Sequence, residues 1–477
     1  MRNAALLKTP PVGRILPFLA ICLTALALVS CASALTTAAP GQYAQPKQYT
    51  LDNGLKVLIV EDHKAPLAVF QIWYRVGSVD ETPGKTGLSH FLEHMMFKGT
   101  PAYASKVFTG IISRNGGMDN AFTTRDFTMY YQSLASDRIN LSLELESDRM
   151  QNLLLPPADI ESEKQVVMEE RRLRYEDNPQ NLLFEEVSEK AMDVHTYRNP
   201  VIGWMDDIKA LSGEDLRRHY KTYYAPNNAV IIVAGDVRAG ELIGQIKERF
   251  GGIPSSAINR PAPPAEKMHK GGRRFTERSP QAELPFVLTA YNVPSLPDTD
   301  AYALNVMASL LSGKSGRLYL HLVRAKGLAL DTFSEYDAFS RHPFLFFLGA
   351  TAKDEAGAAA LEAEFWRELD DLKTNAPEER EVQKVKNQME ASFIMGQDSI
   401  YFQGEMLGMF EMMGDWRLRD KYVEGIRAVR PEDVRRVAQK YFDGDNVTTG
   451  VLLPEKSPPG VAPQNRSSQT AGERGHR

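Results

Sequence analysis

The sequence has very few cysteines and no excess of basic residues. Its 477 residues include only two cysteines, Cys22 and Cys31, both near the N-terminus. The remainder of the chain can therefore form neither a disulfide nor a thiolate metal site, and a bound metal would need histidine and carboxylate ligands. Lysine and arginine (56) do not outnumber aspartate and glutamate (61), and the net charge of −5 gives no support for nucleic-acid binding.

Long apolar runs are also missing, except for one at the N-terminus. Arg2, Lys8 and Arg14 precede an apolar run from Ile15 to Val29, which is too short to cross a bilayer comfortably. Small residues follow this run. These features predict that residues 1–34 are a secretory signal peptide with its cleavage region, and that the protein is exported to a bacterial periplasm.

Two cleavage positions compete within this signal. Ala32-Ser33-Ala34 fits a small-x-small site, which would release a soluble protein. Leu28-Val29-Ser30-Cys31 resembles a bacterial lipobox, which would leave a lipidated Cys31 as the first residue and anchor the protein to a membrane. The lipobox is slightly favoured, because a cysteine is otherwise an odd choice at the end of such a run.

A repeat organises the rest of the chain. The segment Ala210–Arg218 returns as Ala428–Arg436, at an offset of 218 residues (428 minus 210). Each copy has the pattern of a capped helix, and a β-rich run follows each one. Further helical patterns cover 138–154 and 159–175 in the first half, and 358–372 and 378–395 in the second.

The repeat predicts two homologous domains, at residues 48–255 and 281–455. The segment 256–280 between them is rich in proline, glycine and basic residues, which is typical of a linker. The polar tail at 456–477 is expected to be disordered. Because strand patterns alternate with helical ones, and Asn53-Gly54 predicts a tight hairpin, the expected fold class is α+β. Each domain is expected to be a mainly antiparallel sheet with helices packed on one face.

The chemical signal is the pentapeptide from His90 to His94. Its two histidines lie four residues apart in a helix-compatible stretch, so both imidazoles project from one face, as a single Zn²⁺ ion requires. Glu93 lies beside that face, where a carboxylate can take a proton from a metal-activated water. This order of residues occurs among zinc peptidases, although a short motif can also match by chance.

A catalytic zinc site needs a third protein ligand. Glu163 and Glu170 lie seven residues apart in a highly charged helical pattern and therefore share one face. Such a helix is more often a solvated surface than a metal site, so the pattern alone leaves this ligand open. The other histidines, including His195, His219 and His321, are expected to be structural.

Several motifs together resemble those of one known family. The sequence is similar to the pitrilysin, insulin-degrading enzyme and mitochondrial processing peptidase family of inverted-motif zinc peptidases, and the likeness spans nearly the whole chain after the signal. It most resembles a short bacterial catalytic subunit. The matching residues are His90 to Thr100, Asn115 to Gly117, Asn120 to Thr123, Asp126 to Thr128, Glu163 to Glu170, and Pro226 to Asn228.

The resemblance implies roles for individual residues. It implies that His90, His94 and Glu170 bind one zinc ion per chain, that Glu93 is the general base, and that Glu163 orients a zinc ligand. It also implies an edge strand that pairs with the backbone of a peptide substrate, and a side-chain pocket beside the metal. These substrate-binding positions are Asn120, Ala121 and Phe122.

The second half departs from the family's active-site pattern. At the 218-residue offset, Gln388 replaces Glu170, which implies a metal-free homologous domain. Related enzymes take an arginine and a tyrosine from such a domain, but here these positions are Val323 and Leu330, and Arg324 is one residue out of register. The resemblance therefore implies a partner, either a metal-less homologous subunit that supplies the arginine and tyrosine, or a second copy in a homodimer.

The predicted function is that of a zinc metalloendopeptidase acting on peptides or unfolded protein segments. The main alternative is a non-catalytic scaffold or chaperone-like subunit of the same fold, and a metal-binding lipoprotein without enzyme activity is a further one. The complete set of His90, Glu93, His94 and Glu170 favours the enzyme, because binding alone would not require Glu93.

Overall fold

The computed structural model describes residues 44–260, 262–266 and 270–455. The predicted signal with its Cys31, and the predicted tail at 456–477, lie outside the described residues. Within the described part, none of the helices is both long enough and apolar enough to cross a membrane.

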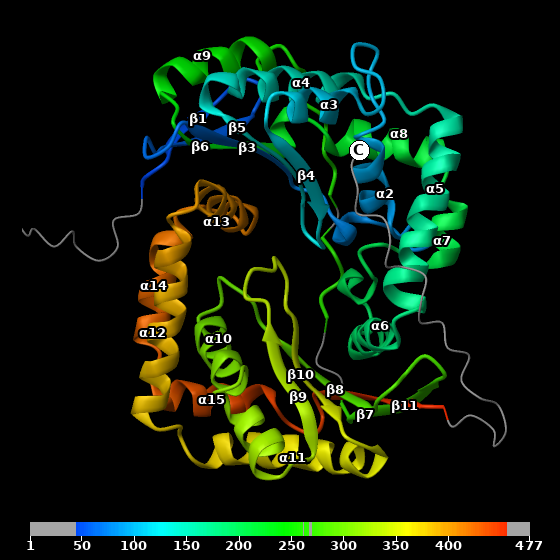
Figure 1. The fold of residues 1–477 in the computed structure, drawn as a ribbon, viewed down its shortest axis with the longest axis vertical. Coiled ribbons are helices and arrows are strands. Elements are labelled where there is room, and N and C mark those ends of the chain that lie inside the picture. The colour runs from blue at the N-terminus through cyan, green and yellow to red at the C-terminus, as the bar shows by residue number, and fades with distance from the viewer. Residues whose placement is uncertain (1–43, 261, 267–269, 456–477) are drawn as a thin grey trace, which may run out of the picture. The chain divides into compact units, whose positions relative to one another are not determined.

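The first half of the chain, from β1 to α9, is built on a six-stranded sheet with the order β1-β2-β6-β3-β5-β4 (Figure 1). Only β2 and β6 run parallel to each other. The predicted hairpin at Asn53-Gly54 is confirmed, since β1 and β2 pair antiparallel and Gly54 has a φ of 88°. The strands are β1 (Lys47–Thr50), β2 (Lys56–Glu61), β3 (Leu67–Tyr74), β4 (Met118–Thr123), β5 (Thr128–Ala135) and β6 (Ala229–Gly235).

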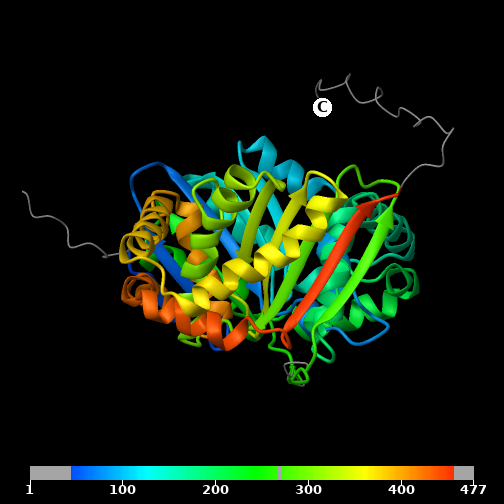
Figure 2. The same ribbon diagram turned by 90° about the horizontal axis from the view of Figure 1, so that it is seen from below.

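The second half, from β7 to β11, is built on a five-stranded sheet with the order β7-β11-β8-β10-β9. Here β7 runs parallel to β11, and the two strands lie side by side at one edge of the sheet (Figure 2). Apart from β1, each strand of the first sheet has a counterpart in the same position here. The strands are β7 (Arg273–Ser279), β8 (Phe286–Val293), β9 (Ala329–Tyr336), β10 (Phe344–Ala352) and β11 (Val447–Pro454).

Strand β7 corrects the predicted linker at 256–280. It corresponds to β2 at the 218-residue offset, so the second half starts at β7 rather than at residue 281. The strand has the sequence RRFTERS and lies at a sheet edge, where polar side chains can face solvent. It therefore lacks the apolar alternation by which strands are recognised in a sequence.

The predicted repeat and its helices are confirmed. Helices α8 and α15 both lie at the 218-residue offset, as do the strands β6 and β11 that follow them. The first-half helices are α2 (Leu88–Met95), α3 (Val107–Arg114), α4 (Ile139–Asn152), α5 (Pro157–Arg171), α6 (Pro179–Ala191), α7 (Met205–Ala210), α8 (Gly213–Tyr223) and α9 (Ala239–Phe250). Those of the second half are α10 (Asp300–Leu311), α11 (Glu355–Thr374), α12 (Glu379–Gly396), α13 (Ile400–Met412), α14 (Leu418–Ala428) and α15 (Pro431–Tyr441).

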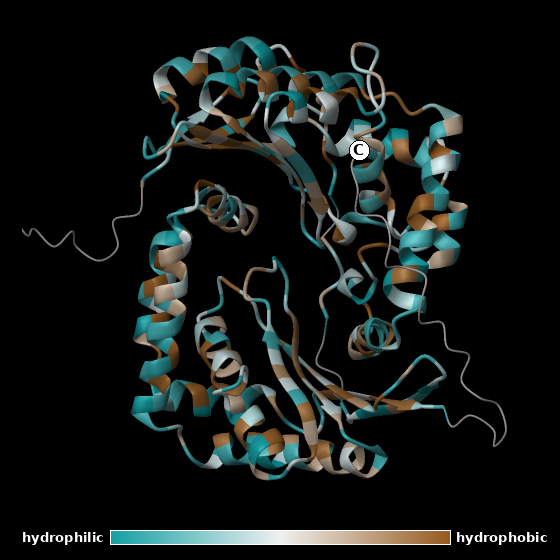
Figure 3. Ribbon diagram, viewed as in Figure 1, coloured by the Kyte–Doolittle hydropathy of each residue, from teal (hydrophilic) through white to brown (hydrophobic). Residues whose placement is uncertain are grey.

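Most helices cover one face of the sheet in their own half, as expected for this α+β fold. Strands β3 and β6 are mainly hydrophobic, whereas the helices also carry hydrophilic faces (Figure 3). The main core of the first half lies between these strands and α2, α4, α5, α8 and α9.

Two helices are exchanged between the halves. Helix α13 of the second half packs on the remaining face of the first sheet, where Leu407 joins a core with Trp73 (Figure 1). Helix α6 of the first half packs in turn on the second sheet, where Leu183 and Val187 join a core with Phe286. At the 218-residue offset α6 coincides with most of α13, so the exchange is reciprocal.

Candidate metal centre

Helix α2, which carries the candidate ligands His90 and His94, starts at a glycine with a positive φ and next to a buried carboxylate. Gly87 has a φ of 84°, and a Cβ atom there would lie 2.3 Å from the carbonyl oxygen of Ile202. Glu81 accepts hydrogen bonds from the backbone N–H groups of Gly87 (2.8 Å) and Ser89 (2.7 Å), which satisfies free donors at the helix start. Burial raises the pKa of Glu81 to about 8, although these hydrogen bonds oppose the rise.

Helices α2 and α5 bring His90, His94 and Glu170 together. Oε2 of Glu170 lies 3.3 Å from Nε2 of His94 and 3.7 Å from Nε2 of His90. In a tetrahedral site with ordinary zinc–nitrogen and zinc–oxygen bonds, neighbouring ligand atoms lie about 3.4 Å apart. Oε2 of Glu170 is buried and has no hydrogen-bond partner. The donor types and spacings therefore fit a zinc ion, and the described residues contain no other such group of three.

Glu163 lies behind this group, as the resemblance implies for a carboxylate that orients a ligand. Its Oε1 is 3.0 Å from Nδ1 of His94, and its Oε2 forms an ion pair with Lys98. Burial opposes protonation of His94, but the hydrogen bond to Glu163 and the adjacent carboxylate of Glu170 prevail and raise its pKa to about 9. Contact with Glu163 through Nδ1 leaves Nε2 of His94 directed at Glu170.

His90 differs from His94 in having no carboxylate behind it. Its side chain is 11% exposed, and burial, together with the nearby His94, lowers its pKa to about 4. A neutral imidazole is the form that binds a metal ion.

Glu93 is held toward the edge strand β4. The hydroxyl group of Thr123, the last residue of this strand, donates a hydrogen bond of 2.5 Å to Oε2 of Glu93. Burial raises the pKa of Glu93, although the Thr123 hydrogen bond opposes this rise. No lysine or arginine forms an ion pair with Glu93 within the described part of the chain. A carboxylate with a raised pKa and no ion-pair partner is suited to repeated uptake and release of a proton.

The predicted substrate-binding residues lie on β4, which pairs with β5 on one side and is otherwise the free edge of the sheet. Asn120 and Ala121 lie in this edge strand as expected. The side chain of Phe122 lies elsewhere, because its ring packs against Trp73 (6.4 Å) and Phe127 (5.9 Å) in the core beneath α13. Phe122 is partly buried there, on the sheet face opposite to Thr123, and its place in a side-chain pocket beside the metal centre stays a prediction.

Sequence reasoning missed three side chains around the centre. Thr123 contacts Glu93, Lys98 pairs with Glu163, and Nη2 of Arg174 lies 2.9 Å from Oε1 of Glu170. Lys98 and Arg174 each follow a proposed ligand by four residues, and this helical spacing was a usable signal.

The positions without the expected arginine and tyrosine lie in the second half. Val323 belongs to a π-helical segment, Tyr319–Ala325, and Leu330 is 48% exposed on β9. The neighbouring Arg324 lies over the ring of Tyr319, at 6.0 Å from its centre. Val323 and Leu330 offer no polar side chain to a substrate.

Family comparisons agree with this arrangement of two halves. The model of the insulinase family, peptidase family M16, matches residues 56–204, and the model of the M16 inactive domain matches residues 210–389. The first match contains the whole candidate metal centre, and the second contains Gln388 in place of a third ligand.

Relatives and solved structures cover most of the chain. The zinc protease PqqE of Helicobacter pylori is 32% identical over 412 residues, which are 85% of this chain and 92% of the relative. The zinc protease YmxG of Bacillus subtilis is 26% identical, over 84% of this chain and 96% of its own length. The crystal structure of a protease from Helicobacter pylori superposes with a TM-score of 0.83 at 30% identity, covering 86% of this chain and 100% of that one. This chain therefore belongs to the M16 family of peptidases, and its named relatives are zinc proteases.

Proposed function

We propose that this chain is a zinc endopeptidase in which Glu93 is the general base. One observation carries the proposal: His90, His94 and Glu170 converge around a buried, unpartnered carboxylate oxygen, with Glu93 on the adjacent side of α2. A purely structural role would explain a contact between a histidine and a glutamate. It would not explain why Glu93, which has no lysine or arginine partner, lies beside that contact.

In this proposal each side chain has one task. The imidazoles of His90 and His94 and the carboxylate of Glu170 would hold the metal, with His94 giving up its proton when the metal binds, and Glu163 would fix the orientation of the His94 ring. Glu93 takes a proton from the attacking water and returns it to the leaving amine, while Thr123 keeps its carboxylate in position. When bound, zinc supplies Lewis-acid chemistry, since it lowers the pKa of a coordinated water and polarises the scissile carbonyl.

The edge strand β4 is the proposed binding site for the peptide. Its free edge offers backbone N–H and C=O groups next to Thr123, and thus next to Glu93. An extended peptide can add to such an edge by β-augmentation, which places its backbone beside the metal centre. Peptides and unfolded segments can adopt this extended form, whereas a folded domain cannot without local unfolding.

Glu93→Gln tests the catalytic role. The variant is expected to bind one zinc ion, as measured by metal analysis, but to hydrolyse a quenched fluorescent peptide about 10²–10⁴ times more slowly than the unmodified protein. Glu169→Gln is the control, because the Glu169 side chain is 58% exposed and pairs with Arg172 rather than with the metal centre. Full activity of Glu93→Gln, or activity of the unmodified protein that survives chelation of zinc, would exclude this mechanism.

We also propose that the full active site needs a second subunit, either a metal-less homologue that supplies an arginine and a tyrosine or a second copy of this chain. Val323 and Leu330, which stand at the family's arginine and tyrosine positions, support this. The chain alone is then expected to cleave peptides slowly, and to accelerate when the partner is added. Full activity of a purified monomer would refute the requirement, and inactivity with any partner would favour the non-catalytic scaffold.

We further propose that the protein is exported to the periplasm, and that it is lipidated at Cys31. The basic N-terminus, the apolar run and the lipobox-like Leu28-Val29-Ser30-Cys31 support this proposal. Mass spectrometry of the mature N-terminus separates a lipidated Cys31 from cleavage after Ala34 and from an uncleaved chain.

A further inference from the structure

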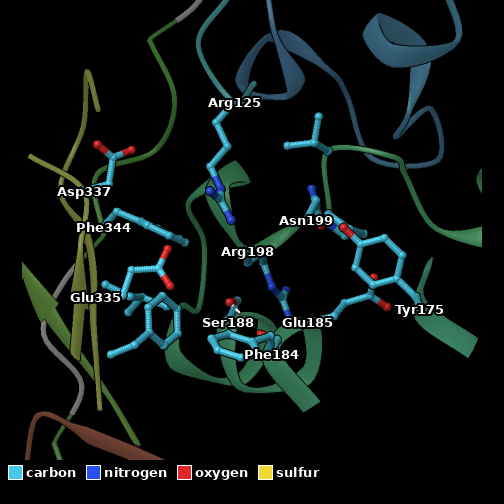
Figure 4. A pocket seen from close by; sticks show the side chains of 14 residues that line it. Arg125, Tyr175, Phe184, Glu185, Ser188, Arg198, Asn199, Glu335, Asp337 and Phe344 are labelled. Carbon is cyan, nitrogen blue, oxygen red and sulfur yellow. Dashed lines mark hydrogen bonds between the residues drawn. The ribbon is translucent and has the colours of Figure 1, made fainter. Parts of the chain in front are cut away.

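A charged pocket of about 320 Å³ lies between elements of the two halves (Figure 4). It is connected to the metal centre along the chain on two sides. On one side, the pocket residue Arg125 comes two residues after Thr123, whose hydroxyl contacts Glu93. On the other side, the pocket residue Tyr175 comes five residues after Glu170. A peptide that pairs with β4 and continues past Thr123 would advance about 3.3 Å per residue toward the Arg125 side of this pocket.

Arg125 is a cation of this pocket that forms no ion pair with a described residue. Its Nε donates to the backbone carbonyl oxygen of Tyr197 at 3.4 Å, and its guanidinium carbon lies 3.9 Å from the centre of the Phe344 ring. Among the described residues it has no ion-pair partner. Burial lowers the pKa of Arg125, which reflects the cost of keeping this charge away from water. An arginine stacked in this way is preorganised for a planar, bidentate anion.

Arg198 adds a second guanidinium group to the same pocket. Its Nη2 pairs with Glu189 at 3.0 Å, but its Nε is buried and has no hydrogen-bond partner in the described structure. Figure 4 shows the side chain of Arg125 extending across the pocket toward the side where Arg198 lies. A buried donor without a partner is costly unless a ligand satisfies it.

None of the pocket's carboxylates forms an ion pair with Arg125 in the described structure, although Glu335 and Asp337 attract it from a greater distance. Glu185 already forms two hydrogen bonds with Arg171, at 2.9 and 2.7 Å. Glu335 and Asp337 lie on the side of the pocket opposite to Glu185 in Figure 4, and both side chains are exposed. Partial desolvation raises the pKa of both groups, and repulsion from Asp337 contributes to the shift of Glu335.

We propose that this pocket binds a carboxylate of the peptide substrate, with Arg125 as the main anchor and Arg198 as a second donor. The carboxylate belongs either to an acidic side chain or to the C-terminus of the peptide. The inference rests on the proposed peptidase function, because that function brings a peptide along β4. A cationic ligand is disfavoured, since the group without an ion-pair partner is the half-buried guanidinium of Arg125, whereas Glu335 and Asp337 are more exposed than it is.

Binding can be measured without cleavage, in the Glu93→Gln protein. The probes are fluorescent peptides that carry Glu, Gln or Lys at one position at a time, each with a free or an amidated C-terminus. At one position, or at two adjacent positions, the peptide with Glu is expected to bind about tenfold more tightly than the peptide with Gln. The reason is that charge-assisted bidentate hydrogen bonds are stronger than neutral ones. A preference only for the free C-terminus would identify the terminal carboxylate instead. No preference for either carboxylate, or a preference for Lys, overturns the proposal.

Two variants with opposite expected effects test whether the preference for Glu over Gln in the peptide arises in this pocket. Arg125→Gln is expected to reduce the Glu-over-Gln ratio to near one, whereas Glu335→Gln with Asp337→Asn is expected to increase it, because two repulsive charges are removed. If Arg125→Gln weakened all peptides equally, Arg125 would be structural and the proposal would fail. Should Arg125→Gln not fold, an unchanged ratio in the double variant overturns the proposal by itself.

The same experiments separate the two proposals. If the unmodified protein cleaves no peptide while the Glu93→Gln protein still prefers carboxylates through Arg125, the pocket stands and the peptidase function fails. If cleavage occurs with no preference in any peptide series, the peptidase function stands and the pocket assignment fails.

Discussion

The two halves of this chain place the same pair of helices in the same position, but only one pair carries the candidate metal centre. In the first half, α2 and α5 supply two histidines and two glutamates around a common point. In the second half, the counterparts α10 and α12 retain Glu381 in place of Glu163, whereas Gln388 stands in place of Glu170. Helix α10 contains no histidine.

The retained glutamate has acquired a different partner. Glu381 accepts hydrogen bonds of 2.9 and 2.7 Å from Arg317, so its carboxylate is used in a surface ion pair. Gln388 instead lines a largely apolar groove that also includes Phe393 and Tyr422. The comparison indicates that helix geometry alone does not make the site, because the loss of two histidines and one glutamate separates the apolar groove from the candidate metal centre.

The largest expected effect concerns this substitution at the third ligand. Glu170→Gln is expected to reduce zinc affinity and peptide hydrolysis by more than about 100-fold, which is the upper loss for residues that only support a ligand. Gln388→Glu is the matched control in the other half and should leave both unchanged, since α10 offers no histidine. Zinc analysis and a peptide assay measure both. Retained zinc in Glu170→Gln would remove Glu170 from the ligand set.

The next prediction concerns how the second half is locked onto the first. Glu411 of α13 is fully buried and contacts Nζ of Lys56 at 2.6 Å and Nη2 of Arg75 at 2.5 Å, both of the first half. Glu411→Gln is expected to lower the free energy of unfolding by about 3 kcal/mol, because it leaves two partly buried cations without an anion. The control Asp415→Asn removes the ion pair between Arg417 and Asp415, whose side chains are 57% and 49% exposed. It is expected to change the free energy of unfolding by at most about 0.5 kcal/mol. Equal effects in urea denaturation would contradict this ranking.

Glycine allows α13 to approach the first sheet closely. A Cβ atom at Gly408 would lie 2.2 Å from Cε2 of Trp73, so Gly408→Ala is expected to cost about 1–3 kcal/mol through overpacking. Gly244 is also helical but has no atom within 4 Å of such a Cβ, and Gly244→Ala is expected to stabilise by up to about 1 kcal/mol. Thermal unfolding should therefore shift in opposite directions. A neutral Gly408→Ala would mean that α13 is not packed closely on Trp73.

The last prediction is an acid sensitivity that depends on a buried histidine of the first half, His219. His219 is 5% exposed, its Nε2 lies 3.1 Å from Oγ of Ser89, and burial lowers its pKa to about 3, whereas its counterpart at the 218-residue offset is Val437. The unfolded chain takes up this proton below its ordinary pKa of 6.5, so stability is complete above that pH and falls as the pH drops toward 3.

The slope from this histidine is at most about 1.4 kcal/mol per pH unit. His219→Gln keeps a polar partner for Ser89 but cannot titrate, and should flatten the pH dependence of the unfolding free energy between pH 6.5 and 4. An unchanged profile would show that another group governs acid unfolding.

Local patterns made much of this fold predictable. Asn53-Gly54 indicated the first hairpin, and the copy at 428–436 indicated the duplicated helix and strand. The grouping of His90 with His94 follows from helical spacing, whereas the approach of Glu170 depends on how two distant helices pack and came only from the family resemblance. The roles of these residues remain predictions until the variants are tested.

What the sequence did not reveal depends on contacts between distant segments. Strand β7 is polar because it lies at a sheet edge, so its pattern was indistinguishable from that of a linker. Phe122 precedes Thr123 in β4 and so faces the opposite side of the sheet by strand alternation, but the core that it meets there, with Leu407 of α13, is made by a distant segment. The exchange of α6 and α13 has no local signature, because it concerns which sheet a helix covers rather than whether it is a helix.

That exchange has a consequence for the origin of the duplication. A single half on its own would leave one sheet face uncovered, and could cover it only by trading its helix with another copy of itself. This is the arrangement of a domain-swapped homodimer, with α6 and α13 as the traded element. Fusing two such copies into one chain makes the association independent of protein concentration. The fused chain then needs only one of its copies to keep the chemistry, while the other must still donate α13 to its neighbour.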